Sequence, residues 1–404
     1  MNLTLRNPGK QLALLCAVIY FVSYLTRHNY AAVLTEVIAS GTASSTAAAV
    51  TTVGFITYGF GQLISGFLGD RLRPQRLILL GLLLTTLMNL SLPLCHTGWQ
   101  MCLVWGVNGG AQALLWPPMV KLLSRLSKED YQDACVNVTI GGSAGTIGIY
   151  FLAPLVLSLS DWHSVFYACA SIGLLAALLW SFRINSLLDK LESTQQQTQQ
   201  VQQKKKLPAA CIPVTALVIF AIILQGILRD GITTWAPVYL YEVYHLTPSF
   251  SILISVTIPI MSVVGVKTAA LVYNRKIPGA RKCAGVFFLA GFLFALLLLL
   301  AKGASPILFS GLAALLTACM HGINMLLISV FPLHYQKFGR ISFFSGLLNS
   351  ATYVGSALAS FGFDRVARAA GWNWVIFLWA VISAAGALLC FWAHRQGFPD
   401  EKKK

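Results

Sequence analysis

Stretches of about 20 consecutive apolar residues recur along the whole chain, and short polar or Gly- and Pro-containing connections separate them. A bilayer-spanning α-helix needs an apolar stretch of this length. The strands of a membrane β-barrel are about half as long and alternate between apolar and polar positions, unlike these continuous runs. The pattern therefore predicts an all-α membrane protein with about twelve transmembrane helices.

The expected helices form two groups of six. The first six are predicted to begin near Gln11, Ser45, Gln75, Trp99, Tyr131 and Trp162, and the second six near Pro208, Thr247, Arg281, Pro306, Ser342 and Trp372. The first apolar stretch follows Arg6 and Lys10, as the core of a signal peptide would. It continues past signal-peptide length and carries tyrosines and an arginine on one face, so we expect it to remain as a membrane helix.

Composition agrees with this interpretation, since the 404 residues are 56% hydrophobic and only 10% charged, with a mean hydropathy of +0.71. The net charge of +16 does not indicate nucleic acid, because most Lys and Arg residues lie at the two termini or in alternate connections between helices. This positive-inside distribution predicts a multi-pass protein of the cytoplasmic (inner) membrane with both termini in the cytoplasm.

Several kinds of site are disfavoured by the sequence. The nine cysteines are scattered and form no CxxC pair, so neither a metal site nor a disulfide framework is expected. A nucleophile elbow and a Walker-type phosphate loop are also missing from the sequence. We therefore expect neither an enzyme nor a bound cofactor.

The two groups of helices are related to each other. Residues 1–182 and 208–404 each carry six predicted helices, and the polar Gln- and Lys-rich segment 183–207 between them is predicted to be a flexible cytoplasmic linker. The motif "DWHSVF" at 161–166 opens the sixth helix, and "GWNWVIF" at 371–377 opens the twelfth. Weak internal similarity of this kind is typical of duplicated transporters with pseudo-symmetric halves and a substrate site near the membrane midplane.

Arg27 in the first helix and Arg229 in the seventh lie half the chain length apart, so they occupy matching positions in the two halves. An arginine at the centre of a membrane helix costs about 2.5–3.5 kcal/mol on insertion scales, which favours a functional role in a polar cavity. Both lie too far inside their helices to reach the membrane surface easily.

Neighbouring polar residues predict a lining for this cavity. Tyr20 and Tyr24 share a helix face with Arg27, and Gln225 shares one with Arg229. Further polar pairs at helical spacing are Tyr58 with Gln62, Asn108 with Gln112, Asn349 with Tyr353, and His321 with Asn324. Any single pair can also join two helices, but together they indicate a polar surface around the two guanidinium groups.

Two guanidinium groups facing one cavity predict a small anionic substrate, most naturally a phosphate, because the planar fork of arginine matches phosphate oxygens. A carboxylate or sulfonate also fits. The only obvious acidic side chain deep in the spans is Asp230, so two positive charges lack matching anions when the site is empty. That shortage favours obligatory exchange of anions. Proton coupling through His28, His321 or Asp230 remains an alternative.

At these residues the sequence resembles a known family. The segment "GFLGDRLRPQR", with Gly66, Asp70 and Arg71, is similar to the loop signature of the major facilitator superfamily. The segments "YLTRHNYA" at 24–31, "WPP" at 116–118 and "LRDGITTWAPVYL" at 228–240 resemble bacterial glycerol-3-phosphate and hexose-phosphate transporters. The resemblance to this organophosphate:phosphate antiporter family extends over essentially all twelve helices.

The resemblance implies roles for individual residues. Arg27 and Arg229 match the arginines that bind phosphate between the halves, and the site-lining tyrosines are matched by Tyr20, Tyr24, Tyr58 and Tyr353. The family works by alternating access, in which the loop motif braces the inward-closed state. The implied protein is a monomer in the lipid bilayer that exchanges an organophosphate for inorganic phosphate.

Some positions depart from the family. Gln62 replaces a lysine of the glycerol-phosphate branch, and the glycines of "GGSAG" at 141–145, near the position of a histidine in that branch, suit close helix packing. Lys267 has no family role. These departures leave the substrate open. Two alternatives remain, namely a proton-coupled symporter of a carboxylate or sulfonate and a transporter-like membrane sensor of phosphorylated sugars.

Overall fold

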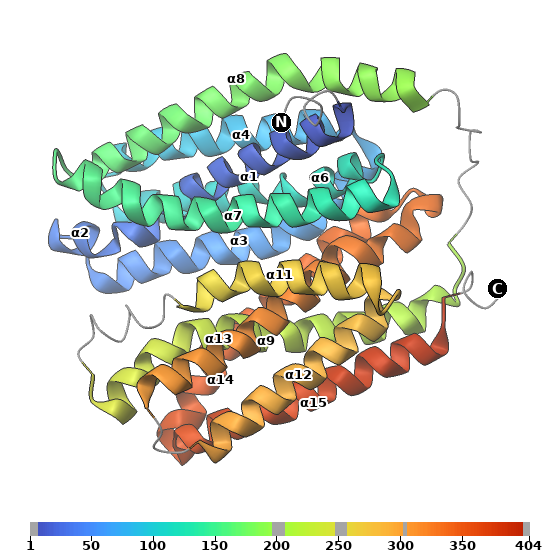
Figure 1. Cartoon of the computed structure of the whole chain (residues 1–404). Coiled ribbons are helices and arrows are strands. Elements are labelled where there is room, and N and C mark those ends of the chain that lie inside the picture. Colours follow the sequence, from blue (N-terminus) through green and yellow to red (C-terminus); the bar gives the residue numbers. More distant parts are fainter. Residues whose placement is uncertain (1–6, 196–206, 247–256, 302–304, 399–404) are drawn as a thin grey trace. The chain divides into compact units, whose positions relative to one another are not determined.

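A computed structural model describes residues 7–195, 207–246, 257–301 and 305–398 of the chain. Within these ranges the regular structure is helical and no β-strand occurs (Figure 1). The helices up to residue 195 are α1 (Pro8–Ala32), α2 (Leu34–Ala39), α3 (Ser44–Arg71), α4 (Pro74–Ser91), the short η2 (Leu92–Leu94), α5 (Gly98–Ala113), α6 (Trp116–Leu123), α7 (Lys128–Leu157) and α8 (Trp162–Gln195).

The later helices begin after residue 207. They are α9 (Cys211–Tyr244), α11 (Thr257–Arg275), α12 (Ala280–Leu300), α13 (Pro306–Asn324), the π-helical η3 (Met325–Val330), the 3₁₀-helical η4 (Phe331–Phe338), α14 (Ile341–Ala370) and α15 (Trp372–Gln396). Eleven of the predicted starts agree with the observed ones to within three residues. The twelfth, near Thr247, lies outside the described residues.

Nine helical stretches within the described ranges are long and apolar enough to cross a membrane by themselves. The other predicted spans correspond to α5 with α6, to α11 and to α14. α5 has only 16 residues, and α14 carries a polar face with Ser345, Asn349, Thr352 and Ser356 at helical spacing. Such polar residues lower the mean hydropathy of a helix. The helix can still span the bilayer when neighbouring helices cover these residues.

Two of the helices begin with a polar residue that satisfies a free backbone N–H group, followed by a proline. Asn7 accepts a hydrogen bond from the Gly9 backbone N–H at 2.8 Å, and Pro8 follows as the first helical residue of α1. Ser305 and Pro306 repeat this arrangement at the start of α13. A polar cap followed by proline is a strong signal for a helix start in a sequence.

The chain folds into two compact units. Unit 1 comprises Met1–Lys205 with His334–Ser350, and unit 2 comprises Lys206–Leu333 with Ala351–Lys404. In unit 1, α1 packs against α7 and α8, and α3 packs against α5. In unit 2, α11 packs against α13, and α15 packs against α12 and α9. The beginning of α14, up to Ser350, therefore belongs to the same unit as α3.

The segment predicted as a linker is partly helical. α8 continues to Gln195 and so includes the first part of the predicted 183–207 linker, while residues 196–206 lie outside the described residues. Ile184, Leu187, Leu188 and Leu191 are buried at i, i+3, i+4 and i+7. This apolar stripe explains the longer helix. The prediction placed the start of the linker too early because the many polar residues of the segment obscured the stripe.

Glycines of α7 allow α1 to approach closely, and the two helices run side by side (Figure 1). A Cβ atom at Gly141 would lie 2.5 Å from the carbonyl oxygen of Ala17, and one at Gly142 would lie 3.1 Å from the rings of Tyr20 and Tyr24. A Cβ atom at Gly145 would collide with the carbonyl oxygen of Phe21. The prediction that "GGSAG" serves close helix packing is confirmed.

A network of buried polar side chains joins α1, α4 and α5. Its members are Thr26, Asn29, Thr85, Asn89, Asn108 and Gln112. Asn29 donates to the side-chain oxygen of Asn89 at 2.6 Å. Gln112 donates to the hydroxyl groups of Thr26 and Thr85 at 2.9 and 2.8 Å. The network fixes α1 against its neighbours, because separating the helices would leave these groups without partners in an apolar environment.

Candidate functional site

Arg27 lies among aromatic rings in unit 1. Its Cζ atom is 4.1 Å from the centre of the Tyr58 ring and 4.9 Å from that of Tyr24. The Tyr20 ring lies 5.0 Å from Tyr24 and 5.2 Å from Trp116. The structure thus brings together four of the predicted residues on α1 and α3, namely Tyr20, Tyr24, Arg27 and Tyr58. Trp116, which extends the aromatic group, was not predicted as a site residue.

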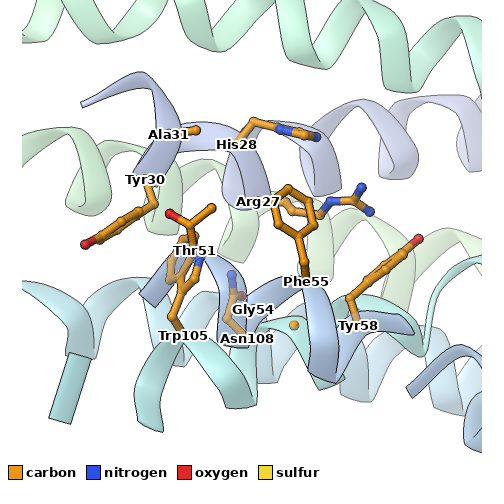
Figure 2. A pocket seen from close by; sticks show the side chains of 11 residues that line it. Arg27, His28, Tyr30, Ala31, Thr51, Gly54, Phe55, Tyr58, Trp105 and Asn108 are labelled. Carbon is orange, nitrogen blue, oxygen red and sulfur yellow. The ribbon is translucent and has the colours of Figure 1, made fainter. Parts of the chain in front are cut away.

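A cavity of about 30 Å³ adjoins Arg27 (Figure 2). It is lined partly by Tyr58, Trp105 and Asn108. In the figure the guanidinium group of Arg27 points to the same side as Tyr58, away from Tyr30 and Trp105. A water molecule needs about 10–15 Å³ of such space, so the cavity admits about two waters and is too small for a sugar phosphate.

His28 follows Arg27 and packs against Tyr24, with 5.2 Å between the ring centres. Its Nε2 atom is buried and has no hydrogen-bond partner among the described residues. The ring therefore belongs to the aromatic group around Arg27. The prediction that His28 takes part in proton coupling stays a prediction.

Gln62 and Asn349 bind one another. Asn349 Nδ2 donates to Gln62 Oε1 at 3.0 Å, and both side chains are buried. Gly346 packs directly against the carbonyl oxygen of Gln62. Both residues were predicted to line the substrate cavity, and in this conformation they lie in the contact between α3 and α14. Asn108 and Gln112 similarly take part in the interhelical network, although Asn108 also borders the small cavity.

In unit 2, Arg229 forms an ion pair with Asp230, the next residue of α9. Arg229 Nε donates to Asp230 Oδ1 at 2.6 Å, and Nη2 donates to Oδ2 at 2.8 Å. The Ser356 hydroxyl group of α14 donates to the same carboxylate. The sequence-based prediction that Arg229 lacks a matching anion in the empty site is therefore wrong.

The remaining predicted residues of unit 2 lie on α9, α13 and α14. Gln225 is buried and donates to the backbone oxygen of Met320 at 2.9 Å, so it joins α9 to α13. His321, also on α13, interacts electrostatically with Arg229 and Asp230. Tyr353 is half-buried on α14. Lys267, for which no role was predicted, is exposed on α11.

The predicted loop motif joins α3 to the start of α14 in unit 1. Asp70 accepts hydrogen bonds from the backbone N–H groups of Ser342 and Phe343 at 3.0 and 2.9 Å. It therefore caps the N-terminus of α14, where a negative charge is stabilising. A Cβ atom at Gly66 would lie 2.7 Å from the Ser342 carbonyl oxygen, so only glycine permits this contact. Arg71 lies over the Phe67 ring, with its Cζ atom 3.6 Å from the ring centre.

Replacing Asp70 with alanine is expected to lower the free energy of unfolding by about 1–2 kcal/mol, the usual effect of losing an N-terminal cap. D70N retains one acceptor oxygen and should lose less. Thermal melting of the purified protein measures the effect, and D189A, at an exposed position of α8, is the control. Equal melting temperatures for D70A and D189A would show that the cap does not stabilise the fold.

Comparison with known proteins places the chain in a family. The sequence profile described as Major Facilitator Superfamily matches residues 16–360. The chain belongs to this superfamily. The superfamily comprises transporters rather than enzymes, as the sequence predicted.

Solved structures of major facilitator proteins share the fold. The transporter FucP in its outward conformation matches with a TM-score of 0.74 at 13% identity, over 97% of this chain and 100% of that chain. The proton:xylose symporter XylE matches with a TM-score of 0.71 at 10% identity, over 96% of this chain and 95% of that chain. The predicted all-α membrane fold with twelve spans is confirmed.

Curated relatives of this major facilitator protein include two that are named for the transport of phosphorylated metabolites. The glycerol-3-phosphate transporter of Bacillus subtilis is 24% identical over 68% of this chain and 67% of its own length. A probable hexose phosphate transport protein of Chlamydia muridarum is 23% identical over 92% of this chain and 87% of its own. The membrane sensor protein UhpC of Escherichia coli is 23% identical over 91% and 87%. These relatives agree with the resemblance to the organophosphate:phosphate antiporter family.

Proposed function

We propose that this protein transports a small organophosphate, such as a sugar phosphate or glycerol phosphate, and exchanges it for inorganic phosphate by alternating access. The observation that supports this most is the pair of arginines at matching positions of α1 and α9, one among tyrosine rings and one bonded bidentately to a carboxylate. A guanidinium fork that holds a carboxylate in this way can hold a phosphate oxyanion in the same way.

The proposal includes the arrangement of the protein in its membrane. We expect a monomer in the cytoplasmic (inner) membrane with both termini in the cytoplasm, as the distribution of Lys and Arg favours. The halves are the predicted residues 1–182, extended to Gln195 by the end of α8, and residues 208–404, and a cytoplasmic segment joins them. Gly66 and Asp70 brace one conformation through the contact of α3 with α14, and Arg71 of the same motif lies against Phe67.

Counterflow in proteoliposomes tests the proposal. Vesicles loaded with inorganic phosphate should take up labelled external phosphate with saturable kinetics, and an imposed proton gradient should not change the rate. Competition by individual phosphorylated metabolites would identify the organic substrate. Without any phosphate exchange the proposed function fails, and uptake of carboxylates or sulfonates driven by a proton gradient would favour the symporter instead.

The relative that is a membrane sensor makes sensing the second candidate function. A sensor would bind a phosphorylated sugar without moving it across the membrane. Titration of the purified protein with such a ligand, combined with the flux assay, separates the two functions. Saturable binding together with undetectable flux would favour the sensor.

The ring of Tyr58 is expected to contribute to anion binding by orienting Arg27. A cation–π contact contributes about 0.5–2 kcal/mol, so Y58L should raise the KM for phosphate exchange by about 2- to 30-fold. Y58F keeps the ring face and should stay close to the wild type. The concentration dependence of counterflow measures both variants, and equal KM values for Y58L and Y58F would contradict this role of the ring.

A further inference from the structure

The carboxylate of Asp230 fills the hydrogen-bonding fork of Arg229. The two N···O distances of 2.6 and 2.8 Å join Nε to Oδ1 and Nη2 to Oδ2, so each oxygen receives one guanidinium hydrogen. The Ser356 hydroxyl group donates to Oδ2 as well. A guanidinium binds one edge of a phosphate in the same bidentate geometry. The Asp230 side chain thus occupies the position in which, according to the proposed function, a substrate oxyanion binds Arg229.

The pair lies deep enough for its charge balance to matter. The side chain of Arg229 is 13% exposed and that of Asp230 is 33% exposed. An isolated guanidinium within a membrane span is costly, and a paired anion removes most of that cost. If the positive charges of the empty site had no anion, the empty transporter could not easily change conformation, and we would expect obligatory exchange of one anion for another. At Arg229 the chain supplies the anion itself.

We propose that Asp230 is an internal counter-anion. It pairs with Arg229 in the empty transporter, and the substrate anion displaces it. This proposal rests on the proposed function. With the charge of Arg229 balanced, the empty protein can change conformation without a bound anion. The protein then performs net uptake as well as exchange, and Asp230 sets the ratio between the two.

The surroundings of Asp230 suit a carboxylate that changes partners. When the substrate binds Arg229, the displaced carboxylate keeps the hydrogen bond from Ser356 on α14. The titratable and polar groups near Asp230 are Arg229 on its own helix, Ser356 on α14 and His321 on α13. The carboxylate therefore keeps one favourable contact besides the ion pair, the hydrogen bond from Ser356.

The first experiment measures the pair without any transport. The full-length protein in detergent is treated with phenylglyoxal, which modifies arginine, and mass spectrometry follows modification of the peptide that contains Arg229. D230N should raise the modification rate about tenfold, since a hydrogen bond to a charged group is lost. S356A should raise it less, and D189N on α8 should leave it unchanged. An unchanged rate in both D230N and S356A would overturn the proposal.

The second experiment compares two fluxes of labelled inorganic phosphate in proteoliposomes. Net uptake is measured into phosphate-free vesicles and exchange into phosphate-loaded vesicles. In D230N the ratio of net uptake to exchange should fall at least about tenfold, because the empty site keeps an unbalanced charge. An unchanged ratio would overturn the role of Asp230. If the wild type exchanges no phosphate, the proposed function fails, while phenylglyoxal reactivity still decides whether Asp230 occupies Arg229.

Discussion

Replacing either Arg27 or Arg229 with lysine is expected to lower anion uptake by about 10- to 100-fold, although the positive charge is kept. Arginine donates two parallel hydrogen bonds to one oxyanion, whereas lysine presents a single ammonium group. Losing one charge-assisted hydrogen bond corresponds to about 1.5–3 kcal/mol. At Arg27 the variant also loses the planar group that stacks on Tyr58. At Arg229 it loses the bidentate contact with Asp230.

Controls for these variants exist in both units. Arg183 on α8 and Arg275 at the end of α11 are exposed, so R183K and R275K keep charge at positions away from the proposed site. Uptake of labelled phosphate is compared at equal amounts of protein in the membrane, determined by immunoblotting. Full transport by both R27K and R229K would remove these arginines from the site. If R183K and R275K lowered uptake as much as R27K and R229K do, the loss of uptake would reflect impaired folding and not a role in the site.

The fold could be predicted from the sequence because membrane helices carry a strong signal. The position and length of the apolar stretches located both the spans and their starts, and the first start was placed near Gln11, close to the observed start at Pro8. The end of α8 was missed because Asp189, Lys190 and Glu192 surround the buried Leu191, so composition and periodicity gave opposite indications. Periodicity was correct, since a buried apolar stripe stabilises a helix even in a polar segment.

The candidate site could be predicted only in part, because helical spacing defines a face but not the neighbour that the face meets. The i, i+4, i+7 spacing correctly grouped Tyr20, Tyr24 and Arg27. The same kind of spacing grouped Asn349 with Tyr353, yet Asn349 bonds Gln62 in a helix contact. Polar residues suit a cavity and a helix contact equally well, so only the packed structure separates the two.

The Arg229–Asp230 pair was missed for a related reason. Adjacent residues of a helix point in different directions, and salt bridges are normally sought at i+3 or i+4. The long arginine side chain nevertheless turns back onto the neighbouring carboxylate, which Ser356 of α14 holds from the other side. No sequence signal links residue 356 to residue 230, because their proximity depends on how α9 and α14 pack.

A single methyl group at Gly145 is expected to impair both stability and transport. A Cβ atom there would collide with the carbonyl oxygen of Phe21 and lie 2.9 Å from the Cβ atom of Tyr24. Backbone atoms cannot move aside as a flexible side chain does, so α1 must shift away from α7. Overpacking of this kind costs about 1–3 kcal/mol. Because α1 carries Tyr24 and Arg27, we expect G145A to lower the melting temperature by several degrees and phosphate exchange by about tenfold.

G110A on α5 provides a matched control, since a Cβ atom at that position meets no other atom within 4 Å. Within a helix, replacing glycine with alanine otherwise stabilises by up to about 1 kcal/mol, so G110A should melt at the wild-type temperature or slightly above it. The difference between the two variants therefore isolates the α1–α7 contact from the general effect of alanine on helix stability. If G145A melts and exchanges phosphate like G110A, α1 can shift without cost, and the positions of Tyr24 and Arg27 do not depend on the glycines of α7.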